Sequence, residues 1–227
     1  HTGDTNTAIR FPAADTFTVE TGGSEAFRVD SDQRLLIGGT SSQNQYGSQS
    51  SLQVQGTGFD DSTIALRRDQ NNANPPGIVF AKSRAGSIGG NTIVQDDDQI
   101  GSLFFAAADG TDLTSLAAEI RAEIDGTPGG NDVPGRIVFR TTADGASSPT
   151  ERLRITAAGL VGINSESPVS VLDVTTEASS NSGINFTNIG AAPIIDFKGN
   201  NVASAGRIRM NEASGGEVLQ FAPKTSG

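Results

Sequence analysis

The chain of 227 residues has no cysteine and no tryptophan, and only one histidine, one methionine and one tyrosine. Without cysteine it can form neither a disulfide nor a thiolate site for zinc or an iron–sulfur cluster. A Ser-His-Asp triad would have to use His1, at the chain terminus where order is least expected. We therefore predict no catalytic residue, no metal, no cofactor and no enzymatic activity.

Long hydrophobic runs and an excess of positive charge are also missing. No run of eighteen apolar residues occurs, so we expect no membrane insertion. With 16 Lys and Arg against 26 Asp and Glu, the formal net charge is −10. Binding to the phosphate backbone needs a clustered basic surface, so we expect no nucleic-acid partner.

The chain is rich in residues that favour short strands and tight turns. It contains 28 glycines and abundant Ser, Thr, Asn and Gln, whereas large aliphatic residues are scarce. Short stretches that alternate apolar and polar residues are bounded by Gly, Asn, Asp or Pro, as expected for β-hairpins. We therefore predict an all-β protein.

An internal repeat is the most informative pattern. SEAFRVDSDQRLLIG returns as TERLRITAAGLVGIN, which aligns Glu25 with Glu151 at an offset of 126 residues. A repeat of this kind is typical of elongated structural arrays. We predict a hairpin module at 1–38, a connector at 39–50, a β-rich module at 51–149 and a truncated second copy of the repeat at 150–227. Because that copy is short and the chain starts with His1, we expect a segment of a longer protein.

Alternation places the individual strands. Residues 7–11 and 16–19 are predicted to form one hairpin, and the two halves of the repeated element a second one. In 113–125 the many Ala and Glu residues favour a helix. There, however, Ala118, Ile120, Ala122 and Ile124 alternate strictly with Glu119, Arg121, Glu123 and Asp125, which predicts a half-buried strand. Further strands are expected at 51–56, 62–68, 77–84, 101–110, 135–145, 170–174, 183–188, 193–200 and 205–210.

A Gly followed by apolar residues and a Phe recurs at 77–80, 101–104 and 135–139, with a weaker version at 206–210. Strands that bury only one face need a partner surface, and a three-fold fibre would supply it. These residues lie either at a shared axis or in an ordinary intrachain core. The candidates for core or trimer interface are Phe80, Phe104, Phe139, Phe197, Ile120 and Ile124.

Several acidic residues lie close together in the sequence. Glycan-cleaving sites use paired carboxylates, which could come from Asp60 with Asp61, Asp96 to Asp98, or Asp109 with Asp112. Most of these lie in turn contexts beside Gly, so we predict turns or solvated loops instead. Calcium could use oxygen ligands at 108–112 and 124–132, but Asp-Gly turns explain both segments.

Two stretches resemble a known family. HTGDTNTAIRFPAADTFTVETGGSEAFRVDSDQRLLIGGTSS is similar to a segment of tail-fibre proteins of tailed bacteriophages, often of marine bacteria or cyanobacteria. PGRIVFRTTADGASSPTERLRITAAGLVGINSESP resembles their stalk segments, which often precede a C-terminal intramolecular chaperone. The chain departs from the fuller pattern because it contains no such chaperone region, so we expect that this region was removed on maturation or that the segment ends before it.

This resemblance implies an elongated, β-rich homotrimeric fibre of the virion, exposed to the extracellular medium and extending to the bacterial surface for host attachment. Its implied partners are other tail or baseplate proteins and a bacterial surface glycan or protein receptor, bound by this or a more distal segment. The three chains would form a β-prism, a triple β-helix or β-sandwich modules. The receptor-binding residues are unknown. The alternatives are a tailspike depolymerase, a phage head fibre or a bacterial surface adhesin.

Overall fold

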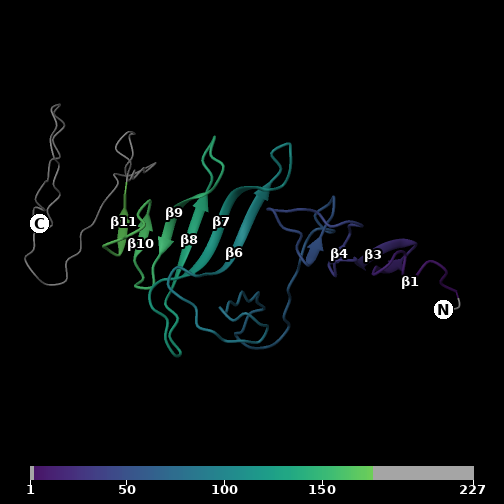
Figure 1. Ribbon diagram of the computed structural model, residues 1–227, viewed down its shortest axis with the longest axis horizontal. Helices are drawn as coiled ribbons and strands as arrows, with labels where there is room; N and C mark the ends of the chain where they lie inside the picture. Colours follow the sequence, from purple (N-terminus) through teal and green to yellow (C-terminus); the bar gives the residue numbers. More distant parts are fainter. Residues whose placement is uncertain (1–2, 176–227) are drawn as a thin grey trace, which may run out of the picture. The chain divides into compact units, whose positions relative to one another are not determined.

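The structure, a computed structural model, describes residues 3–175 (Figure 1). These residues form eleven strands and no helix, which confirms the all-β prediction. No helix that could cross a membrane is therefore present in this part of the chain. The strands belong to two mixed sheets, each with antiparallel pairs and one parallel pair.

The first sheet has the strand order β1-β2-β3-β4-β5. Its strands are β1 (Ala8–Arg10), β2 (Phe17–Thr21), β3 (Ser24–Val29), β4 (Leu35–Ile37) and β5 (Leu52–Val54). The two predicted hairpins are confirmed as the antiparallel pairs β1–β2 and β3–β4. Gly22 and Gly23 join β2 to β3 in a two-residue turn with φ values of 60° and 79°, a conformation that glycine adopts without strain. β5 pairs with β4 in parallel.

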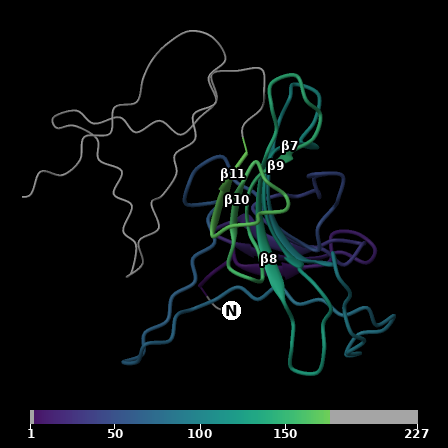
Figure 2. The ribbon, with the colours of Figure 1, turned by 90° about the vertical axis from the view of Figure 1, so that its left-hand side faces the viewer.

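The second sheet has the order β11-β10-β9-β8-β7-β6. Its strands are β6 (Gln99–Ala107), β7 (Ser115–Ile124), β8 (Gly135–Thr141), β9 (Thr150–Ile155), β10 (Val161–Ile163) and β11 (Leu172–Val174). The loop at 125–134 extends beyond one end of the strands and the loop at 142–149 beyond the other (Figures 1 and 2). β7 confirms that the period of two outweighs helix propensity in 113–125.

The sequence repeat is also a repeat of backbone pairing. β9 and β10 have the register of β3 and β4: Leu153 lies opposite Ile163 as Phe27 lies opposite Ile37. The pairing of β8 with β9 matches that of β2 with β3, including a bulge at the corresponding place. β11 then pairs in parallel with β10 as β5 does with β4. The repeating unit is therefore five strands, β1–β5 and β7–β11, and β6 is an addition to the second copy.

Some sequence-based expectations differ from the structure. The predicted strands at 62–68 and 77–84 are not strands, and no strand lies between β5 and β6. These two segments have no strand partner within the described part of the chain, so their alternation alone does not create a sheet. β5 joins the first sheet, and the second sheet runs through residue 150. The module boundaries given above stay a prediction. The strands predicted at 183–188, 193–200 and 205–210 lie outside the described residues.

Candidate functional site: the two faces of the second sheet

One face of the second sheet, here called the apolar face, carries apolar residues in cross-strand register. Residues directly opposite each other lie on the same face, and so do alternate residues of one strand. The first row is Leu103, Ile120, Phe139, Leu153, Ile163 and Val174. The second row is Gly101, Ala122, Ile137, Ile155, Val161 and Leu172. An unbroken apolar surface therefore crosses all six strands.

The apolar face is not covered within the described chain. Phe139 exposes 37% of its surface, Ile137 45% and Leu172 55%, although they stand in the middle and at the edge of a sheet. Apolar surface of this kind is stabilised by removal from water, at about 25 cal/mol per Å². A contiguous exposed apolar area is typical of an interaction site.

The first sheet has a matching face. Its rows are Ile9, Val19, Phe27, Ile37 and Val54, and Phe17, Val29, Leu35 and Leu52. The rings of Phe17 and Phe27 pack edge to face, with centroids 6.1 Å apart. Leu52 remains exposed, and Phe27 is half-buried. The repeat therefore conserves an apolar face between its two copies.

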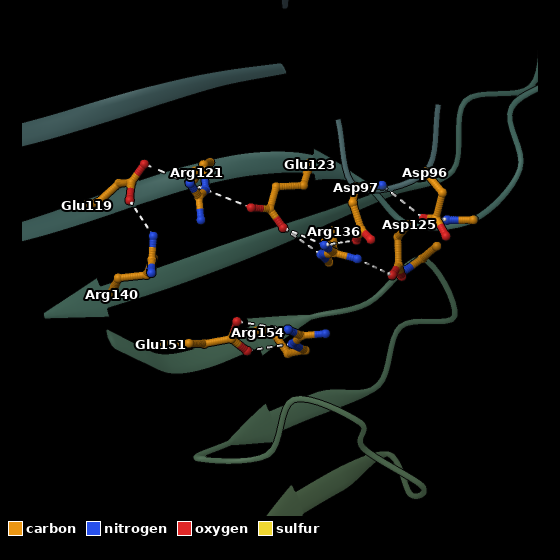
Figure 3. Close-up of polar contacts among 12 residues, drawn as sticks. Asp96, Asp97, Glu119, Arg121, Glu123, Asp125, Arg136, Arg140, Glu151 and Arg154 are labelled. Carbon is orange, nitrogen blue, oxygen red and sulfur yellow. Dashed lines mark hydrogen bonds and ion pairs between the residues drawn. The ribbon is translucent and has the colours of Figure 1, made fainter. Parts of the chain in front are cut away.

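The opposite face of the second sheet, here called the charged face, holds a network of ion pairs (Figure 3). Arg121 Nε lies 2.7 Å from Glu123 and 3.6 Å from Glu119, and Arg140 approaches Glu119 to 3.2 Å. Arg136 bridges Glu123, Asp125 and Asp97 at 2.7, 3.1 and 2.6 Å. These residues come from β7, β8 and the loops that follow β7 and precede β6.

The burial of the charged face differs from the sequence-based expectation. Glu119 and Glu123 expose only 3% and 7% of their surface, whereas Ala122 on the other face is exposed. The physical reason is that each carboxylate has an arginine from its own or the neighbouring strand, and paired charges can be buried. The alternation Glu119-Arg121-Glu123 beside Arg136 and Arg140 was the available signal, but which charges face one another depends on the strand register.

Hydrogen bonds to carboxylates raise the pKa of Arg136 and of Arg154. Burial alone would lower the pKa of Arg136, but hydrogen bonds to Asp97, Glu123 and Asp125 raise it above its ordinary value. In β9 the hydrogen bonds of Arg154 to Glu151, at 2.5 and 2.8 Å, raise the pKa of Arg154. The same fork occurs in β3, where Arg28 donates to Glu25 at 2.6 and 2.7 Å, so the repeat also conserves an ion pair.

The candidate core residues occupy different environments. Ile120 and Phe139 lie in the first row of the apolar face, and Ile124 is completely buried within the chain. Phe104 lies on the charged face, and Phe80 lies in the segment between β5 and β6 with half of its surface exposed. Phe197 is outside the described residues. Participation of these residues in a trimer interface stays a prediction.

Phe104 contacts the connector predicted at 39–50. The ring centroids of Tyr46 and Phe104 are 4.6 Å apart, and the Tyr46 N–H donates to the Leu113 carbonyl at 2.9 Å. Tyr46 and Gly47 have positive φ values of 52° and 72° in a turn closed by Gln45 and Ser48. This turn and the end of β6 line an open hollow of about 510 Å³. The connector therefore contains a turn, residues 45–48, that packs on β6.

Most of the aspartates named above as possible carboxylate pairs accept hydrogen bonds in turns and ion pairs. Asp109 accepts backbone hydrogen bonds from Thr111 and Asp112, and Asp61 accepts one from Gly58. Asp98 does not lie in a solvated loop as expected. It is buried and accepts from Arg84 at 2.6 and 2.8 Å, which holds its pKa well below the ordinary value of 3.8. Within residues 3–175 no group of three or more His, Asp or Glu side chains is arranged to hold a metal ion.

Comparison with known proteins identifies the fold. No family model matches the chain, and no curated protein matches it either. Among solved structures, the chain is similar to the carboxy-terminal domain of the bacteriophage T5 L-shaped tail fibre, with a TM-score of 0.56 and 16% identity over 82% of each chain. The same domain with its intramolecular chaperone also has a TM-score of 0.56 and 16% identity, over 84% of this chain and 58% of that one. The fold of this chain is thus that of a phage tail-fibre domain.

Proposed function

We propose that this chain is a structural component of a bacteriophage tail fibre, which assembles as a homotrimer and extends the virion to the bacterial surface for attachment. The observation that carries the proposal is the uncovered apolar face, which is repeated in both sheets of a fold similar to a tail-fibre domain. Three copies can bury their apolar faces around one axis, because a closed symmetric assembly removes that surface from water.

The charged face supports this orientation. Its carboxylates and arginines are already paired within one chain, so they need no partner from another copy. The net charge of −10 of the whole chain also favours solubility of the assembled fibre. The apolar faces then point inwards and the charged faces outwards, and other tail or baseplate proteins would meet this fibre at its ends.

Sedimentation equilibrium of the full chain tests the assembly. We expect three times the chain mass of 23.3 kDa and a melting temperature that rises with protein concentration. Phe139→Asp should shift the mass towards a single chain, because it places a charge in the middle of the apolar face. Ser147→Asp, at an exposed position of the loop at 142–149, is the matched control and should remain trimeric. A wild-type chain that stays at 23.3 kDa would contradict the homotrimer.

Electron microscopy of purified virions with a labelled antibody against the chain tests the location. We expect the label along a tail fibre. Absence of the protein from the particle would overturn the proposal, since an adhesin of the bacterial surface would not be found there.

A further inference from the structure

The segment between the two sheets, residues 57–98, is here called the arm. It forms no strand, yet many of its large apolar side chains are exposed. These side chains are Phe59, Ile64, Leu66, Ile78, Val79, Phe80, Ile88 and Ile93. Folding normally removes such side chains from water, so their exposure in one chain indicates that another surface covers them.

Much of the arm's backbone also has no partner within residues 3–175. From residue 63 to residue 83, the only backbone-to-backbone hydrogen bond within the described chain runs from the Asn72 N–H to the Gln70 carbonyl. Yet the sequence predicts strands at 62–68 and 77–84, from the alternating Ile64 and Leu66 in the first and from the apolar run Ile78 to Phe80 in the second. An extended backbone with free N–H and C=O groups is a template for pairing with another chain. Both segments therefore have no strand partner in the part of the chain that the structure describes.

One end of the arm is fixed beside the apolar face. Arg84 and Lys82 both reach Asp98, immediately before β6. Phe80 lies over Gly101, where an added Cβ would come within 2.5 Å of the Phe80 Cβ. Gly101 stands in the second row of the apolar face, so the Phe80 side chain continues that row where β6 has no side chain. The C-terminal end of the arm thus lies at the edge of the apolar face, the surface proposed to be buried between copies.

The free edges of the sheets indicate which chain the arm meets. Each sheet ends in strands with one unpaired edge within the described residues: β1 and β5 in the first, β6 and β11 in the second. A second copy of this chain therefore presents unpaired strand edges to residues 62–68 and 77–84.

We infer that the arm lies on a second copy of this chain, where residues 62–68 and 77–84 form intermolecular strands. This inference rests on the homotrimer proposed above and specifies how its chains interlock. The exchange of arms buries their apolar side chains and gives both segments hydrogen-bond partners. The copies then separate only when the arms unfold, which makes dissociation slow.

Photocrosslinking of the full chain tests the inference. Two forms of the chain with tags of different mass are co-expressed, and only one carries benzoylphenylalanine in place of Ile78, whose side chain is exposed. We expect crosslinks that join the two forms. The control carries benzoylphenylalanine in place of Asp144, in the loop between β8 and β9, and should not join them. One outcome is a trimeric chain in which position 78 gives no crosslink between the two tagged forms. In that case the inference fails and the homotrimer stands. If the chain is a monomer, both fail.

Hydrogen exchange of the trimer provides a second measurement. Within the described residues the amides of 63–68 and 77–83 have no backbone acceptor, so they should exchange as rapidly as the unbonded amides of 143–145, in the loop between β8 and β9, unless another copy covers them. We expect them to remain protected after that loop has exchanged completely. Exchange at the rate of the loop would overturn the inference.

Discussion

The two copies of the repeat share their backbone and differ in the side chains that they bury. In both copies the same bulge, the same parallel last strand and the same arginine–glutamate fork recur. On the face opposite the apolar one, however, Thr18 and Leu36 of the first copy correspond to Val138 and Gly162 of the second. The pairing pattern therefore defines the repeat, and the buried positions determine how stable each copy is.

The second copy also has more support than the first. β6 covers the outer edge of β7, whereas β1 has no further strand beside it within the described residues. The network around Arg136 joins strands and loops of the second sheet, while the first sheet has the exposed pair of Arg10 with Glu20 at its edge. We expect the first sheet to open more readily than the second in hydrogen exchange.

The largest expected loss of stability comes from mutating Leu36 or Gly162, which occupy corresponding positions in the two copies. Leu36 is completely buried, so Leu36→Ala should reduce the stability of the first sheet by about 2–5 kcal/mol through lost burial and a cavity. At Gly162 an added Cβ would lie 2.2 Å from the Ser165 carbonyl oxygen, so Gly162→Ala should destabilise the second sheet instead. Hydrogen exchange of each sheet at one fixed protein concentration measures both effects. Loss of protection in the wrong sheet for either variant would contradict the comparison.

An intermediate loss of stability is expected from breaking the arginine–glutamate fork that both copies share. Glu25→Gln and Glu151→Gln each leave a largely buried arginine without its carboxylate and should cost about 1–3 kcal/mol. The control is Glu20→Gln, because Arg10 is more than half exposed and surface pairs contribute about 0–1 kcal/mol. Denaturant unfolding at constant protein concentration measures the three variants. Equal losses for all three would mean that burial of the fork has no energetic consequence.

Much of the fold could be predicted because it depends on local sequence. Strict alternation identified β7, and the repeated element identified β3 with β4 and β9 with β10. The parallel pairing of β5 with β4 could not be predicted, because the two strands are separated by a connector without periodicity. Alternation also predicted strands at 62–68 and 77–84, where one chain supplies no partner.

The candidate site was less predictable than the fold. Ile120 and Phe139 were identified as interface candidates, and both lie on the apolar face. The charged face was missed because alternation does not tell which side of a strand is buried. That depends on which residues lie opposite, and a bulge beside Phe139 brings Arg140 opposite Glu151. One residue of slip would exchange the two faces.

The smallest expected effect concerns the position that Thr18 and Val138 share. Each exposes only 1% of its surface, but the Thr18 hydroxyl has no hydrogen-bond partner within the described chain. Thr18→Val should therefore stabilise the first sheet by about 1 kcal/mol, because the side chains are similar in size and the unpaired hydroxyl is removed. Val138→Thr should destabilise the second sheet by about 1 kcal/mol for the converse reason. Thr150→Val, at an exposed position of β9, is the control and should change stability by less than about 0.5 kcal/mol. Denaturant unfolding with hydrogen exchange assigns each change to its sheet, and a loss of stability in Thr18→Val would show that its hydroxyl is hydrogen-bonded in the assembled protein.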